Sequence, residues 1–107
     1  MMTKRELRFT PEAQRNLKDL ESNPAKAGVL KQVRKTLGLM EINLRHPSLK
    51  THKYESLQGP NGEEVFEAYA QSKTPGAYRI FFVYGPDRSE GKTHIAVLTV
   101  IAITAHP

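Results

Sequence analysis

Residues of complementary chemical character lie in the second half of the chain, where they could act together on an anionic group. Glu67 offers a carboxylate that can take up a proton, and Arg79 offers a planar fork of donors that matches phosphate oxygens. Tyr69 offers an aromatic ring on which a nucleic-acid base could stack. His106, near the end of the chain, offers an imidazole, a group that ordinarily titrates at about pH 6.5. These residue types together can perform acid–base chemistry at a phosphate.

Alternation along two predicted strands places most of these residues on one face of a sheet. In segment 77–84 the aromatic and aliphatic residues at even-numbered positions form a core face, so Arg79 points to the opposite side. In segment 65–70, Glu67 and Tyr69 alternate with apolar residues and fall on the same side as Arg79. A simpler interpretation is a cross-strand ion pair between Glu67 and Arg79, which would contribute little at a surface.

The first half of the chain predicts a short strand followed by two helices. Segment 5–9 alternates as a strand, and Thr10 then provides an N-cap for a helix that ends where proline follows Asn23. The second helix is predicted over 25–44, because its apolar residues recur at intervals of three and four. The short turn between the helices predicts an antiparallel pair.

The second half predicts strands over 54–57, 65–70, 77–84 and 94–104, with turn-forming residues between them and a loose hairpin loop over 85–91. The order of elements indicates an α+β fold. A two-helix antiparallel hairpin is expected to pack on one face of a mostly antiparallel four- or five-stranded sheet, in a single domain covering 1–107.

Composition favours a cytoplasmic protein with a polyanionic partner. The chain has 107 residues, no cysteine, and a net charge of +5 at pH 7, with a sequence pI near 9.6. No apolar run is long enough to span a membrane, and no secretory signal is visible at the start. The basic residues bunch in 26–45 and 50–53, which favours contact with RNA, DNA or an acidic protein. The four histidines are widely spaced, so neither a metal nor a cofactor is expected.

Several segments, taken in order, resemble the RelE/ParE superfamily of toxins, and the resemblance covers nearly the whole chain. The segments are FTPEA at 9–13, HP at 46–47, KTHK at 50–53, LQG at 57–59, VFEAY at 65–69, GAYRIFF at 76–82 and IAITAHP at 101–107. The resemblance implies the toxin of a type II toxin–antitoxin system. Many members cleave mRNA in the ribosomal A site, the ParE branch inhibits DNA gyrase, and some members are not toxic.

The ribonuclease branch of this resemblance implies roles for the residues above. Metal-independent RNA cleavage needs a base, a cation that stabilises the phosphate and an acid, for which we expect Glu67, Arg79 and His106 respectively. Family members that end in a histidine use it as the acid.

Lys50, His52, Lys53 and Tyr69 are expected to contact RNA, with His52 a weaker candidate for catalysis. The alternative for the three residues of 50–53 is a solvated basic turn. The expected partners are mRNA on the ribosome and an acidic antitoxin in a hetero-oligomer. A gyrase inhibitor and a non-toxic, antitoxin-binding homologue remain the alternative functions.

Overall fold

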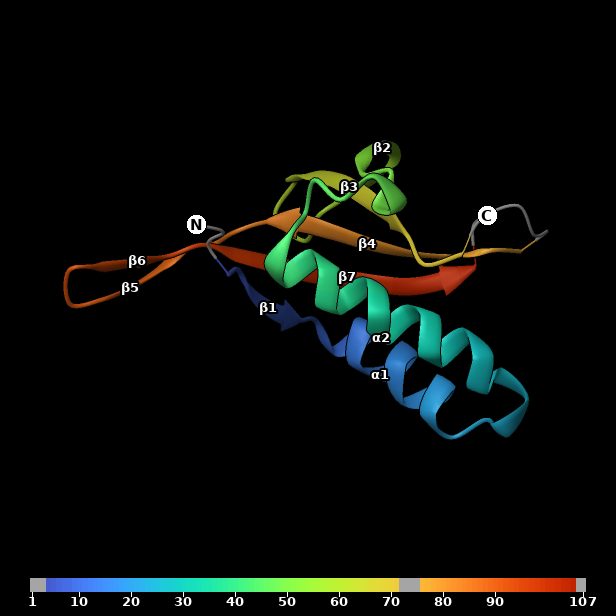
Figure 1. Ribbon diagram of the computed structural model, residues 1–107. Helices are drawn as coiled ribbons and strands as arrows, with labels where there is room; N and C mark the ends of the chain where they lie inside the picture. The colour runs from blue at the N-terminus through green and yellow to red at the C-terminus, as the bar shows by residue number, and fades with distance from the viewer. Residues whose placement is uncertain (1–3, 72–75, 106–107) are drawn as a thin grey trace.

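Two helices cover one face of a five-stranded sheet in the computed structural model, which describes residues 4–71 and 76–105 (Figure 1). The strand order is β1-β7-β4-β3-β2; β1 runs parallel to β7, and the other neighbours are antiparallel. The strands of this sheet are β1 (Glu6–Phe9), β2 (His52–Gln58), β3 (Glu64–Tyr69), β4 (Tyr78–Tyr84) and β7 (Val97–Ala105). The helices are α1 (Pro11–Glu21) and α2 (Ala27–Ile42), with short 3-10 turns η1 (Pro24–Lys26) and η2 (Pro47–Leu49). The expected α+β fold is therefore confirmed.

The helix boundaries follow from local capping chemistry. The Thr10 hydroxyl accepts a hydrogen bond from the Ala13 N–H at 3.2 Å, which satisfies one of the free donors of the first turn of α1. The predicted second helix was too long at both ends, because Pro24–Lys26 forms a 3-10 turn before α2 begins at Ala27. Among the described residues, no helix is long and apolar enough to cross a membrane.

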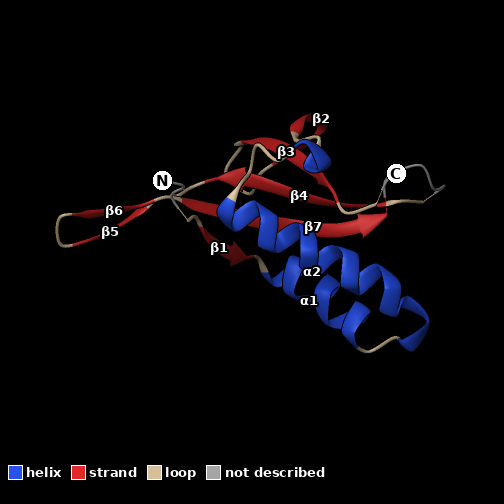
Figure 2. Ribbon diagram, in the orientation of Figure 1, coloured by secondary structure: helices blue, strands red, loops and turns tan. Residues whose placement is uncertain are grey.

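The main core lies between the helices and the sheet, on the side that Figure 2 shows covered by α1 and α2. The central strands β4 and β7 supply its most deeply buried residues. Its fully buried large side chains are Val33, Met40, Leu49, Ile80, Phe82, Leu98 and Ile103.

The opposite face of the sheet carries a smaller apolar cluster of Val65, Phe81 and Val83. Tyr54, from β2, packs against Phe81 with ring centroids 5.0 Å apart. A register shift in the β4–β7 pairing separates Phe81 from Phe82, and these neighbours point to opposite faces. The helix-free face is thus apolar at one end, and its other end is left for polar residues.

A second, two-stranded sheet replaces the loop predicted over 85–91. Strands β5 (Arg88–Glu90) and β6 (Thr93–Ile95) form a hairpin that projects from the end of the main sheet (Figure 1). The Arg88 guanidinium anchors its base through hydrogen bonds of 2.7–3.0 Å to the Glu6 carboxylate. These three-residue strands are mostly polar and too short to show alternation, which is why the sequence does not predict a hairpin of strands there. The predicted strand over 94–104 is accordingly divided between β6 and β7.

Candidate functional site

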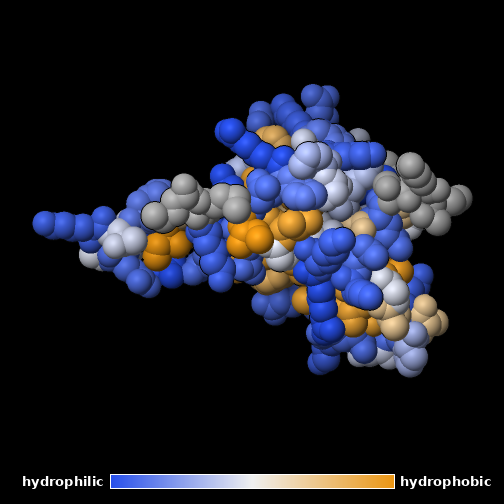
Figure 3. Space-filling model, in the orientation of Figure 1, coloured by the Kyte–Doolittle hydropathy of each residue, from blue (hydrophilic) through white to orange (hydrophobic). Residues whose placement is uncertain are grey.

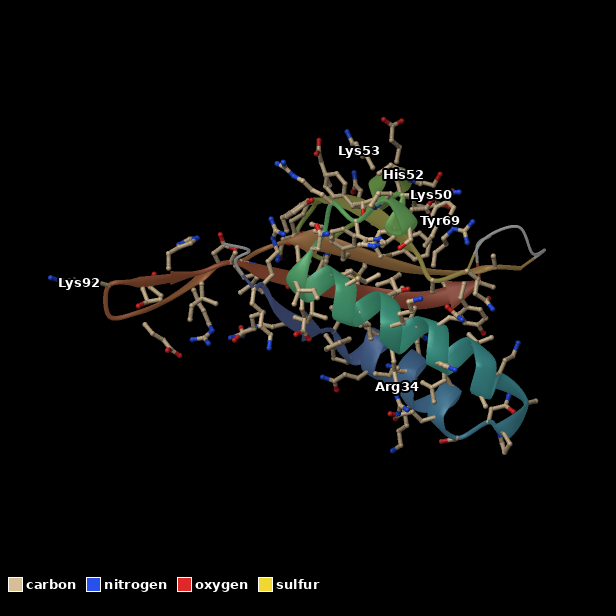
Figure 4. All side chains as sticks on the ribbon, viewed as in Figure 1. Arg34, Lys50, His52, Lys53, Tyr69 and Lys92 are labelled. Carbon is tan, nitrogen blue, oxygen red and sulfur yellow. The ribbon has the colours of Figure 1, made fainter. Side chains whose placement is uncertain are left out.

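The polar end of the helix-free face brings together residues from β2, β3 and β4. Tyr69 lies directly opposite Arg79 in the β3–β4 pairing, and Glu67 lies opposite His52 in the β2–β3 pairing. Directly opposed residues share a face, so Glu67, Tyr69 and Arg79 lie away from the helices, as the alternation predicted. Figure 4 shows Lys50, His52 and Tyr69 close together around β2 and β3.

The carboxylate of Glu67 is buried behind the imidazole of His52. Only 2% of the Glu67 side chain is exposed, whereas 46% of the His52 side chain is exposed. His52 Nε2 lies 2.7 Å from Glu67 Oε1, and His52 Nδ1 lies 2.7 Å from the carbonyl oxygen of Lys50. The register places Glu67 opposite Phe81 and Arg79 opposite Tyr69, so Glu67 and Arg79 are not directly opposed across β3 and β4.

The two contacts of His52 limit how protons can be arranged in this pair. A carbonyl oxygen only accepts hydrogen bonds, so His52 Nδ1 is the donor to Lys50. The contact between Nε2 and Oε1 is a hydrogen bond when a further proton lies on the imidazole or on the carboxyl group. In that protonated form, the His52–Glu67 dyad can deliver a proton to a substrate through its exposed member.

Arg79 is held in place by contacts with Gln71 and Tyr69, and the Tyr69 ring also contacts His52 edge-on, with ring centroids 5.8 Å apart. The Arg79 side chain is largely buried, with 9% exposure, and its Nη1 donates to the carbonyl of Gln71 at 2.6 Å. Its guanidinium carbon lies 3.6 Å from the centroid of the Tyr69 ring. Among the described residues, the buried Nε–H of Arg79 meets no acceptor, an arrangement that costs about 1–3 kcal/mol. A bound anion would offset that cost.

Lys50 adds a second positive charge, and an unusual backbone conformation positions it. Lys50 ends η2 in the left-handed region, with φ 46°, and its N–H donates to the Pro47 carbonyl at 3.2 Å. Its Nζ lies 5.5 Å from the centroid of the Tyr69 ring. His46 caps the start of η2 by accepting from the Ser48 N–H at 3.2 Å. The turn that the sequence marked only as basic therefore has a defined geometry.

Not every predicted residue joins this cluster. Lys53 lies opposite Phe66, a residue that packs against the helix-side core, and its Nζ pairs with Glu64 at 3.1 Å. His106, the expected acid, lies outside the described residues. In the parts that are described, no group of three or more His, Asp or Glu side chains could hold a metal ion.

Sequence reasoning missed the supporting contacts of the site. It treated His52 mainly as an RNA contact and assigned no role to Gln71. The pairing of His52 with Glu67 depends on the register of β2 against β3, which no local pattern encodes. Arg79 contacts the backbone carbonyl of Gln71, which lies beyond the end of β3, so the alternation of the strand does not predict where this carbonyl points. The alternation of residues along a strand shows which side chains share a face of the sheet, but not which residues of the adjacent strand they contact.

The fold matches solved structures, although neither a family model nor a curated protein matches the chain. The chain resembles the YoeB dimer structure from Staphylococcus aureus with a TM-score of 0.57 and 14% identity, covering 98% of this chain and 100% of that one. It also resembles the conserved hypothetical protein HP0894 from Helicobacter pylori, with a TM-score of 0.53 and 18% identity, covering 99% and 96% of the two chains. The likeness is one of fold. It agrees with the α+β fold expected from the sequence, two helices on one face of a mostly antiparallel sheet.

Proposed function

We propose that this chain is the toxin of a toxin–antitoxin pair and that it stops translation by cleaving mRNA without a metal. The observation that carries the proposal is the contact of 2.7 Å between the exposed His52 and the buried Glu67, which lies on the same sheet face as Arg79. The likeness in fold to YoeB supports the toxin role. The net charge of +5 supports a polyanionic substrate.

The dyad suits the role of proton donor. When a proton bridges Nε2 and Oε1, the dyad can give that proton to the leaving 5′-oxygen. His52 is the member that reaches the substrate, and the Lys50 carbonyl orients its ring by accepting from Nδ1. Nε2 would exchange its contact with Glu67 for the leaving 5′-oxygen and give it a proton. As the P–O2′ bond forms and the P–O5′ bond breaks, the Glu67 carboxylate takes the 2′-hydroxyl proton, which is the base role expected from the sequence. His106 stays a prediction.

Arg79 suits the role of phosphate stabiliser. Its planar fork matches two phosphate oxygens, and its supports at Gln71 and Tyr69 hold it in place before substrate arrives. Preorganised donors of this kind contribute about 10²–10³ in rate. Lys50 contributes a second charge above the same Tyr69 ring, which raises the local concentration of anionic substrate.

Brief induction followed by mapping of transcript ends tests the proposal. We expect wild type to produce cut transcripts and to halt translation. His52→Ala and Arg79→Ala should each reduce cutting by about 10²–10³. His94→Ala is the matched control, because that imidazole is 70% exposed on the projecting hairpin and pairs with Asp87 at 3.1 Å. Cutting by purified protein with and without ribosomes would establish whether ribosomes are required.

Other outcomes would overturn the assignment. Broken DNA and a DNA-damage response without cut transcripts would instead indicate a gyrase inhibitor of the ParE type. The absence of both effects would indicate a non-toxic homologue that only binds its antitoxin. If His52→Ala and Arg79→Ala cut as efficiently as His94→Ala, the site would be misplaced even if the protein is a nuclease.

The proposed protein partner is an acidic antitoxin that is partly disordered when free and folds on binding. Co-expression with the protein encoded beside this one should yield a complex that purifies together and suppresses toxicity. Failure of any acidic neighbour to bind or to suppress toxicity would count against the toxin–antitoxin role.

A further inference from the structure

A second basic surface, which we call the basic groove, lies where the chain leaves α2 and passes the end of β4. It has a volume of about 430 Å³, and Arg5, Arg45, His46, Lys50 and Tyr84 line it. No acidic side chain is among its described lining residues. Figure 3 shows hydrophilic side chains over much of this face of the molecule, with apolar patches between them.

Among the described residues, the arginines of the basic groove differ from the other arginines in that their side chains have no partner. Elsewhere, arginines pair with carboxylates or are buried: Arg8, Arg15, Arg34 and Arg88 form ion pairs, and Arg79 lies in the candidate site. Within residues 4–71 and 76–105, the side chains of Arg5 and Arg45 form neither an ion pair nor a hydrogen bond. The nearby carboxylate of Glu41 is engaged by Lys4 at 3.5 Å. The groove therefore presents uncompensated positive charge.

Aromatic and hydrogen-bonding groups complete the groove. The Tyr84 side chain is 49% exposed, and edge-on contacts with Phe66 and Phe82, at centroid distances of 5.0 and 5.7 Å, hold its ring in place. His46 Nδ1 accepts from the Ser48 N–H, so a neutral His46 carries its proton on Nε2 and is a donor there. A fixed exposed ring beside unpaired guanidinium groups is the combination that binds single-stranded nucleic acid.

We propose that the basic groove binds a flanking part of the same RNA strand, with phosphates on Arg5 and Arg45 and a base on Tyr84. This inference rests on the proposed function for its choice of RNA as ligand. Lys50 belongs to both places, since it lines the groove and its Nζ reaches the Tyr69 ring of the candidate site. One strand can therefore run from the groove to the site past Lys50. An acidic protein segment would use the charges but would leave the exposed Tyr84 ring without a function.

Fluorescence anisotropy with a labelled single-stranded RNA of about 10 nucleotides measures this binding directly. Titrations of the full chain between about 50 and 200 mM salt give both affinity and salt dependence. Arg5→Ala and Arg45→Ala should each weaken binding and flatten the slope of log K against log salt by about 0.7. Tyr84→Leu should weaken binding about tenfold without changing that slope, whereas Tyr84→Phe should retain affinity.

Arg34→Ala is the matched charge control, because Arg34 lies on α2 away from the labelled cluster of Lys50, His52 and Tyr69 (Figure 4). Thermal unfolding of each variant checks that the fold is retained. If Arg5→Ala and Arg45→Ala weaken RNA binding no more than Arg34→Ala does, or if Tyr84→Leu binds as wild type, the proposal is overturned. Loss of antitoxin binding with RNA affinity unchanged would reassign the groove to a protein.

The nuclease proposal and the groove proposal fail in different ways. If the groove variants lower RNA affinity but wild type cuts no RNA, the groove proposal is retained and the nuclease assignment is wrong. If wild type cuts RNA but the groove variants bind RNA as tightly as wild type, the groove proposal is wrong and the nuclease assignment is retained. Single-turnover cutting at saturating RNA should be unchanged in Arg34→Ala, since Arg34 pairs with Glu21 and lies outside both the candidate site and the basic groove.

Discussion

The stacked pair of Arg79 and Tyr69 gives a sharp energetic prediction. A cation–π contact contributes about 0.5–1 kcal/mol at exposed sites and about 2 kcal/mol when it is desolvated. The guanidinium carbon lies 3.6 Å from the ring centroid, and Arg79 is only 9% exposed, so the contact belongs near the desolvated limit. We therefore expect a coupling free energy between the two side chains of about 1.5 kcal/mol.

A double-mutant cycle measures this coupling. The four proteins are wild type, Tyr69→Leu, Arg79→Met and the double variant, each unfolded in urea at constant pH. Both replacements keep an apolar side chain in place. The change in unfolding free energy of the double variant, minus the sum of the changes in the two single variants, therefore isolates the contact from a general loss of packing. A coupling of this size corresponds to about 1 M in the urea midpoint for a domain of this length. A coupling below about 0.5 kcal/mol would refute the stacked geometry.

The same variants separate two roles for Tyr69 in the proposed nuclease. If Tyr69 acts by holding Arg79, Tyr69→Leu should lower the single-turnover cutting rate about tenfold, the equivalent of about 1.4 kcal/mol in the barrier, with RNA affinity nearly unchanged. Were Tyr69 instead a platform for a base, as the sequence suggested, RNA affinity would fall and the rate at saturation would be retained. Tyr69→Phe should preserve the rate, because the ring face that contacts Arg79 remains.

Further predictions concern the stability of the fold. Hydrogen bonds from Arg88 and Arg8 lower the pKa of Glu6 from 4.5 to about 2, so this carboxylate stabilises the folded state above pH 4.5, and that contribution is lost as pH falls toward 2. Glu6→Gln should therefore show a smaller loss of stability than wild type over this acid range in urea titrations. Thr10→Ala should cost about 0.5–2 kcal/mol in urea unfolding, since it removes the cap of α1, whereas a cost near zero would refute that role. Leu98→Ala should cost about 2–5 kcal/mol by the same assay, because Leu98 is fully buried in β7, and a cost below about 1 kcal/mol would contradict its burial.

The parts of the fold that are periodic or locally capped could be predicted from the sequence. The Thr10 cap and the antiparallel helix pair follow from interactions within a few residues, and the structure confirms them. Of the predicted core face of β4, Ile80 and Phe82 are fully buried, whereas Tyr84, at the end of the strand, is 49% exposed. The second helix was predicted too long, because the apolar spacing continues beyond both ends of α2. Pro24–Lys26 forms a 3-10 turn before the helix, and the helix ends at Ile42. The β5–β6 hairpin was missed because its short polar strands depend on Arg88 reaching Glu6, a contact between distant parts of the chain.

The sequence predicted which face of the sheet carries the candidate site, but it did not predict which side chains contact one another there. Alternation placed Glu67, Tyr69 and Arg79 together without any knowledge of strand order. It could not reveal that His52 covers Glu67 or that Tyr69 supports Arg79, since both facts depend on registers between strands. Alternation therefore found the face that these residues share, whereas their neighbours across the strands were visible only in the structure, and their roles stay predictions.

The helix-free face is apolar at one end and polar at the other, and the stability of the fold alone does not explain why polar residues occupy the second end. At the other end of the same face, Val65, Phe81 and Val83 form an apolar cluster that is almost fully buried. Placing Glu67 beside them at 2% exposure incurs a desolvation cost that an apolar residue would avoid. The buried Nε of Arg79 adds a second cost for the fold. Such departures from local consistency are expected where a protein gives up stability for function, and both lie where the proposed substrate would bind.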